Sequence, residues 1–174
     1  MQFDIFGPFK VPLDENGNVP ADLSRFWDQV DNAHKGLRGA RGCYVFCIKT
    51  SGSSRYFPWY VGKSVAQTFD KECFAPHKRV HYAGAISRYE RAVPCIFLIA
   101  AKTPTGRFSK GISERSIRFV EEYMIGLGIT RNEDLRNKKS TKFYKEIVIP
   151  GILNRGAGHN KSAAHFRSTM GIAG

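Results

Sequence analysis

Two tyrosines each stand two positions from a glycine in short apolar runs, in "GCY" at 42–44 and "YVG" at 60–62. A polar connection rich in glycine and serine separates the runs, which is typical of a β-hairpin. Two interpretations remain open: a plain hairpin with packed aromatic side chains, or two phenols brought together for chemistry. Because a phenol ionises at about pH 10, Tyr44 could act as a base at pH 7 only beside a cation.

One carboxylate stands at the border of an apolar helix face. Apolar residues recur at helical spacing across 114–127, and these are Ile117, Val120, Met124 and Leu127. Glu121 lies at the edge of this stripe, whereas Glu122 points away from it. A carboxylate in such a place needs a partner or a metal ion. A salt bridge to a nearby arginine is the alternative for Glu121.

The cysteines show neither a CxxC pair nor the spacing of a disulfide framework; they are Cys43, Cys47, Cys73 and Cys95. Free cysteines within apolar runs fit a reducing cytoplasm, which is the expected location. Cys73, His77 and His81 are spaced four apart and could share a helical face suited to zinc. Pro76 interrupts that helix and a fourth ligand is missing, so structural zinc is the less favoured interpretation.

The periodicity predicts an α+β fold, with a small central antiparallel sheet of about three strands flanked by helices. We expect an extended lead-in over the first twenty residues, a helix from Asp22 that ends near Gly36, and strands at 43–48, 59–61 and 95–101. One or two helices broken near Pro76 precede the last of these strands. Alternation puts Tyr44, Phe46 and Ile48 on one face of their strand, opposite Cys43, Val45 and Cys47.

The charge of the chain favours a polyanionic partner. Its 174 residues carry 27 Lys and Arg against 15 Asp and Glu, a net charge of +12. Hydrophobic residues at 42% are typical of a globular domain. A balance this basic predicts nucleic acid as the partner ahead of an anionic membrane surface, and we see no long apolar span.

The order of several features resembles the GIY-YIG nuclease family. "GCY" and "YVG" match its two tripeptides, "YVGKS" extends the second, "EEYMIGLG" resembles its glutamate motif, and "GILNRGAG" contains the counterpart of its asparagine. The resemblance covers about 41–156 and implies a metal-dependent endonuclease that hydrolyses DNA, with RNA left open as a substrate. The family's arginine has no counterpart, because Lys71 and Glu72 stand at the corresponding place.

The resemblance implies a role for each matching residue. Glu121 would hold one divalent cation, magnesium first and manganese as the alternative. Tyr44 would take the proton from the attacking water, Tyr60 would orient the water or phosphate, and Asn154 would support the site. Lys63, His77 and Lys78 are the candidates for the missing cation.

Around this site we expect basic residues to contact backbone phosphates without reading sequence; these are Arg79, Arg88, Arg155 and Lys161. The expected organisation is an extension with one helix over 1–40, the nuclease-like domain over 41–156, and a basic tail over 157–174 packed on or near it. Glu72, in the place of a basic residue, favours the alternative of a degraded module that binds nucleic acid without cutting it.

Overall fold

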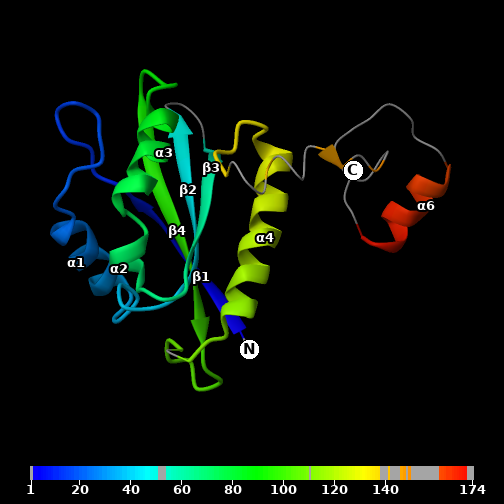
Figure 1. Ribbon diagram of the computed structural model, residues 1–174, viewed down its shortest axis with the longest axis horizontal. Coiled ribbons are helices and arrows are strands. Elements are labelled where there is room, and N and C mark those ends of the chain that lie inside the picture. Colours follow the sequence, from blue (N-terminus) through cyan, green and yellow to red (C-terminus); the bar gives the residue numbers. More distant parts are fainter. Residues whose placement is uncertain are drawn as a thin grey trace. The chain divides into compact units, whose positions relative to one another are not determined.

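The computed structural model describes residues 2–50, 54–109, 111–137, 141, 146–147, 149 and 161–171. The chain divides into two compact units, Met1–Arg136 and Asn137–Gly174. The larger unit contains one four-stranded antiparallel sheet with the order β1-β4-β2-β3 (Figure 1). Its strands are β1 (Gln2–Lys10), β2 (Gly42–Thr50), β3 (Tyr56–Ser64) and β4 (Ala92–Lys102).

Helices cover both faces of this sheet. They are α1 (Ser24–Ala33), α2 (Phe69–Glu72), α3 (Pro76–Ile86) and α4 (Glu114–Arg131). In Figure 1 the first three lie on one side of the strands and α4 lies on the other. Two apolar cores result, a large one under α1–α3 and a smaller one between the sheet and α4.

The predicted alternation along β2 is confirmed. Tyr44, Phe46 and Ile48 are buried in the large core, whereas Cys43 and Val45 pack in the small core against α4. Period-2 patterning specifies the faces of this strand because the sheet is covered on both sides.

The sheet has one strand more than the three that periodicity suggested. β1 forms from the expected lead-in and pairs with β4, with a register shift between Phe6 and Phe9. β3 is also longer than expected and contains Pro58, a residue that argues against a central strand. Pro58 is tolerated because β3 is an edge strand, and the register of its pairing with β2 shifts beside it.

The helix expectations hold, with small changes at the boundaries. Pro76 is the first residue of α3 and separates it from the short α2, as the break near this proline predicted. α4 begins at the expected residue, after the N-cap Ser113 whose side chain accepts from Ser116 N. It continues to Arg131, four residues beyond the predicted end.

The smaller unit contains α6 (Lys161–Thr169) among its described residues. Across the part of the chain that the structure describes, no helix has the length and apolar character to cross a membrane.

Candidate functional site

The two tyrosines of the motif lie on the same face of the sheet. Tyr44 pairs with Gly62 and Tyr60 pairs with Phe46 across β2 and β3, and the two tyrosine ring centroids are 6.4 Å apart. Gly62 is required for this packing. A Cβ added there would lie 2.2 Å from Cζ and 2.3 Å from Oη of Tyr44. The second glycine of the motif therefore makes room for the first tyrosine.

This interlock predicts a large cost for a single methyl group. Gly62→Ala is expected to lower the free energy of unfolding by about 2–3 kcal/mol, because the buried Tyr44 ring must shift in a packed core. Urea unfolding followed by circular dichroism measures the change. Gly111→Ala is the matched control, since nothing lies within 4 Å of its Cβ position, and it should change stability little.

A double variant separates this steric cause from loss of flexibility at the glycine. Tyr44→Leu should make the added methyl group of Gly62→Ala less costly, so that the two changes together destabilise less than their sum. Strict additivity of the two changes would contradict the interlock.

Tyr44 is fully buried, and its hydroxyl has no hydrogen-bond partner among the described residues. Burial, with smaller contributions from Tyr82, Cys73 and nearby acidic groups, raises the pKa of Tyr44 well above 10.0. Burial also raises the pKa of Tyr82 well above 10.0, and the nearby Tyr44 hydroxyl lowers it by a smaller amount. A buried, unpaired hydroxyl costs about 1–3 kcal/mol. Such a group calls for an explanation beyond stability.

A lysine on this face of the sheet, Lys78, contacts the hydroxyl of Tyr60 and not that of Tyr44. Lys78 Nζ donates to Tyr60 Oη at 2.8 Å, and it lies 3.6 Å from Glu72 Oε1. His81 stacks on the Tyr60 ring with centroids 5.1 Å apart. Tyr60 is 9% exposed, so this phenol lies closer to solvent than Tyr44. We call Tyr44, Tyr60, Glu72, Lys78 and His81 the tyrosine cluster.

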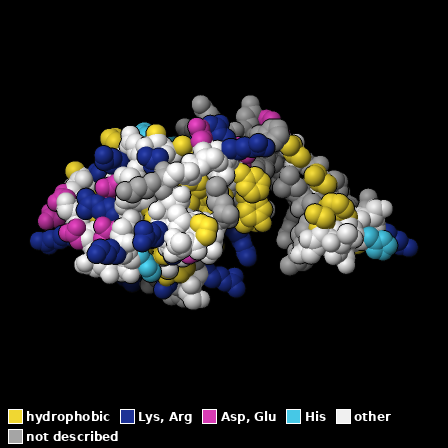
Figure 2. All heavy atoms as spheres, turned by 90° about the horizontal axis from the view of Figure 1, so that it is seen from below, with side chains coloured by type: hydrophobic (Ala, Val, Ile, Leu, Met, Phe, Trp, Pro, Cys, Tyr) yellow, Lys and Arg dark blue, Asp and Glu magenta, His cyan; other side chains and the backbone are white. Residues whose placement is uncertain are grey.

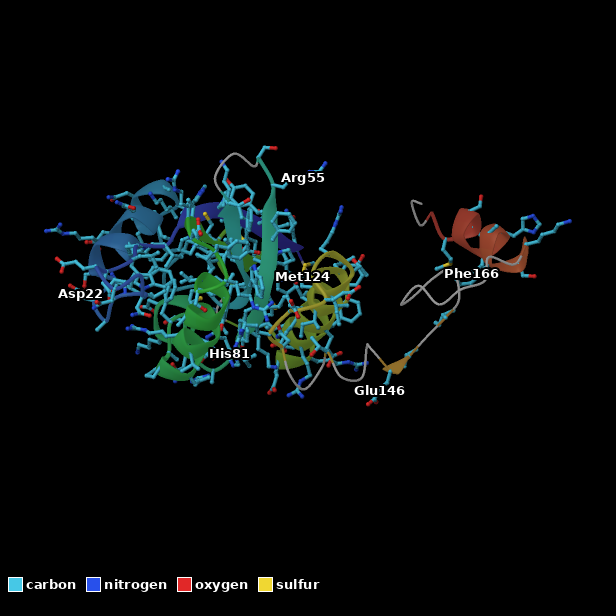
Figure 3. All side chains as sticks on the ribbon, turned by 90° about the horizontal axis from the view of Figure 1, so that it is seen from above. Asp22, Arg55, His81, Met124, Glu146 and Phe166 are labelled. Carbon is cyan, nitrogen blue, oxygen red and sulfur yellow. The ribbon has the colours of Figure 1, made fainter. Side chains whose placement is uncertain are left out.

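The carboxylate of the predicted site lies on the other face of the sheet. Glu121 Oε2 accepts from Lys63 Nζ at 2.5 Å. Lys63 is directly opposite Cys43, which belongs to the small core under α4, and Tyr60 faces the large core. Figure 3 labels His81 on α3 and Met124 on α4, the helices on the two sides of the sheet.

The donor set at Glu121 fits a magnesium ion better than zinc. Magnesium accepts one or two carboxylates and fills its shell with water and substrate phosphates, so one glutamate can suffice. The described residues contain no group of three or more His, Cys, Asp or Glu side chains that could hold a metal ion. Because Lys63 already contacts Oε2, a cation would have to share the carboxylate with this lysine or displace it.

The cysteine of the considered zinc triad is part of the core. Cys73 is fully buried, and burial raises the pKa of its thiol well above 9.0, which opposes the thiolate that zinc requires. His77 is exposed on α3.

Two of the expected phosphate contacts already have protein partners. Arg79 donates to the carbonyls of Phe74 and Ala21, at 2.7 and 3.1 Å. Arg88 pairs with Asp134 at 2.5 Å and lies over the Trp59 ring. Lys161 is exposed on α6, in the smaller unit. Asn154 and Arg155 lie outside the described residues.

Glu72 and His81 belong to the tyrosine cluster, although neither entered the predicted site. Glu72 stood out in the sequence only as the wrong charge at an expected arginine. Its position relative to Lys78 could have predicted their contact. The two residues flank the helix break at Pro76, and the bend between α2 and α3 brings them together. His81 follows Lys78 by three positions on α3, so the two share a helix face.

Comparisons of the chain with protein-family models, with curated proteins and with solved structures find no match.

Proposed function

We propose that this protein is a metal-dependent endonuclease that hydrolyses phosphodiester bonds in DNA. One observation carries the proposal: Gly62 lets two tyrosines pack side by side, and a lysine donates to the hydroxyl of the more accessible one. A plain hairpin needs neither this packing of two tyrosines nor the hydrogen bond from the lysine. The net charge of +12 agrees with a polyanionic substrate. Figure 2 shows lysine and arginine side chains scattered over one face of the larger unit, with acidic side chains among them.

In this proposal the tyrosine cluster positions the reacting phosphate. The Tyr60 hydroxyl accepts from Lys78 and keeps its own proton to donate to a phosphate oxygen or to orient water. Lys78 adds positive charge next to the phosphate, and Glu72 holds the lysine in place. Tyr44 remains protonated at pH 7, because its pKa is raised by burial, and its ring packs beside Tyr60 and supports it.

Glu121 would hold the divalent cation, which when bound supplies Lewis-acid stabilisation of phosphate charge. The tyrosine cluster and the ion pair of Lys63 with Glu121 lie on opposite faces of β3, the edge strand. Gly62 is next to Lys63 in the chain. A nucleic-acid strand that crosses this edge would approach Tyr60 from one side and Lys63 with Glu121 from the other.

A second candidate function is a nucleic-acid-binding module without cleavage. The full burial of Tyr44 favours it, because water cannot reach a hydroxyl that is sealed in the core. The ion pair between Lys63 and Glu121 favours it too, because it occupies the carboxylate that a metal ion would need.

Nicking of supercoiled plasmid in Mg²⁺, Mn²⁺ and EDTA, with binding followed in parallel by gel shift, distinguishes the two functions. If the protein is a nuclease, it cuts the plasmid with either cation and does not cut it in EDTA. The Tyr60→Phe variant then binds DNA but does not cut it. Tyr44→Phe should keep the fold and raise stability slightly, because it removes an unpaired buried hydroxyl. Binding without cutting on supercoiled, single-stranded and branched DNA would establish the module instead. Cleavage that persists in EDTA would contradict the metal-dependent proposal.

A further inference from the structure

A second cationic site lies in the larger unit, away from the tyrosine cluster. A pocket of about 400 Å³ opens between the end of α1 and the turn after β4. This volume lies within the roughly 300–1,000 Å³ of small-molecule sites. Its lining is cationic or aromatic apart from one glycine and contains no acidic residue: Phe6, His34, Lys35, Lys102, Gly106, Arg107 and Phe108.

The aromatic residues form a wall that fixes one of the cations. Lys102 Nζ lies over the rings of Phe6 and Phe108, 5.3 and 5.6 Å from their centroids. Asp4 pairs with the same ammonium group at 3.1 Å from outside the lining. His34 packs its ring edge-on against Phe6. Lys102 is thus held in one orientation with a single compensating carboxylate.

Lys35 and Arg107 give the pocket a net positive charge, because the carboxylate of Asp4 balances only Lys102. Both side chains are exposed at the pocket, and neither forms an ion pair within the described ranges. Net positive charge in a concave, partly apolar site attracts an anion more strongly than the same charges on a flat surface.

Backbone hydrogen bonds make the turn that carries Arg107 rigid. Thr103 N donates to Arg107 O at 2.8 Å, and Gly106 N donates to Thr103 O at 2.9 Å. Gly106 has a φ of 79°, which a glycine adopts without strain. Lys102 and Phe108 then pair in a β-bridge, so the cation and the ring beside it are held together.

We propose that this pocket binds a phosphate group with an attached nucleoside, as found in a free nucleotide or at the end of a nucleic-acid strand. Arg107 and Lys35 contact the phosphate oxygens, because guanidinium and ammonium groups form charge-assisted hydrogen bonds with them. The aromatic wall of Phe108 and His34 receives the sugar or base. The site shares no residue with the tyrosine cluster, so it does not depend on the nuclease proposal.

Calorimetric titration of the full chain with inorganic phosphate, adenosine and adenosine 5′-monophosphate tests the site. We expect the monophosphate to bind more tightly than either inorganic phosphate or adenosine. Arg107→Ala and Lys35→Ala should each weaken its binding by about tenfold or more. Arg131→Ala, an exposed arginine in the last turn of α4, is the charge-matched control and should bind like the parent.

Oligonucleotides with and without a 5′-phosphate then identify the source of the phosphate. A preference for the phosphorylated strand that Arg107→Ala abolishes supports the site with a strand end as ligand. Monophosphate binding that the oligonucleotides cannot compete supports it with a free nucleotide. Equal binding of adenosine and its monophosphate, or equal losses in Arg107→Ala and Arg131→Ala, would overturn the proposal. Circular dichroism of each variant ensures that a loss of binding does not reflect unfolding.

Discussion

Glu121→Gln is expected to nick supercoiled plasmid at least about 100-fold more slowly than the parent protein in Mg²⁺. The amide keeps the shape of the side chain but removes the charge that a divalent cation requires. Glu121 is half-buried beside Lys63, so its charge acts in a region with less solvent than the helix exterior. Rates from single-turnover nicking over a range of Mg²⁺ concentrations measure the effect.

The neighbouring residue provides the control. Glu122 is exposed on the same helix turn, so Glu122→Gln changes the net charge by the same amount and should cut at the parental rate. Lys63→Met should let a cation bind Glu121 more tightly, because it removes the ammonium group that competes for Oε2. If Glu121→Gln and Glu122→Gln cut equally well, the carboxylate does not hold the catalytic metal ion.

The protein is expected to lose its fold between about pH 10 and pH 12. Burial raises the pKa of the Cys43 thiol from 9.0 to about 12, raises that of Cys47 further, and raises that of Cys73 well above 9.0. These thiols stay protonated in the folded state when the unfolded chain has already released its protons. Their contribution is therefore complete below pH 9 and is lost as the pH rises toward and beyond the folded-state pKa.

The slope of the unfolding free energy against pH follows from the number of protons released on unfolding. Above about pH 9, each buried thiol lowers the free energy of unfolding by about 1.4 kcal/mol per pH unit, so three thiols lower it by about 4 kcal/mol per pH unit. Tyr44 and Tyr82, whose pKa values burial also raises, add to the slope above about pH 10. The total reaches the 5–15 kcal/mol that typically separates folded from unfolded protein within roughly two to three pH units.

Urea unfolding at pH 7, 8, 9 and 10 under reducing conditions measures this loss as a fall in the unfolding free energy. The double variant Cys47→Ala/Cys73→Ala should have a clearly shallower slope above pH 9, although it begins from a lower stability at pH 7. An unfolding free energy that stays level from pH 8 to pH 10 would show that water reaches these thiols in the folded protein.

Local sequence patterns determined the helices, the central strands and the face that each residue of β2 takes. Alternation with a period of two put Tyr44, Phe46 and Ile48 in one core, and Pro76 marked the start of α3. Such patterns depend on neighbours in the chain, so they can be predicted without the fold. Tyr60 and Gly62 are two residues apart and so share a strand face, and the pairing of Gly62 with Tyr44 then puts both tyrosines on one face of the sheet.

Only the tertiary structure decided which groups meet across the sheet. β1 pairs with β4 at a separation of some ninety residues, which no local pattern records. Lys78 contacts Tyr60 because the chain bends between α2 and α3, and Glu121 lies opposite the tyrosines because α4 covers the other face. The phosphate pocket combines α1, β4 and the turn that follows it. Long-range packing selects such partners, since hydrophobic periodicity specifies a face but not what covers it.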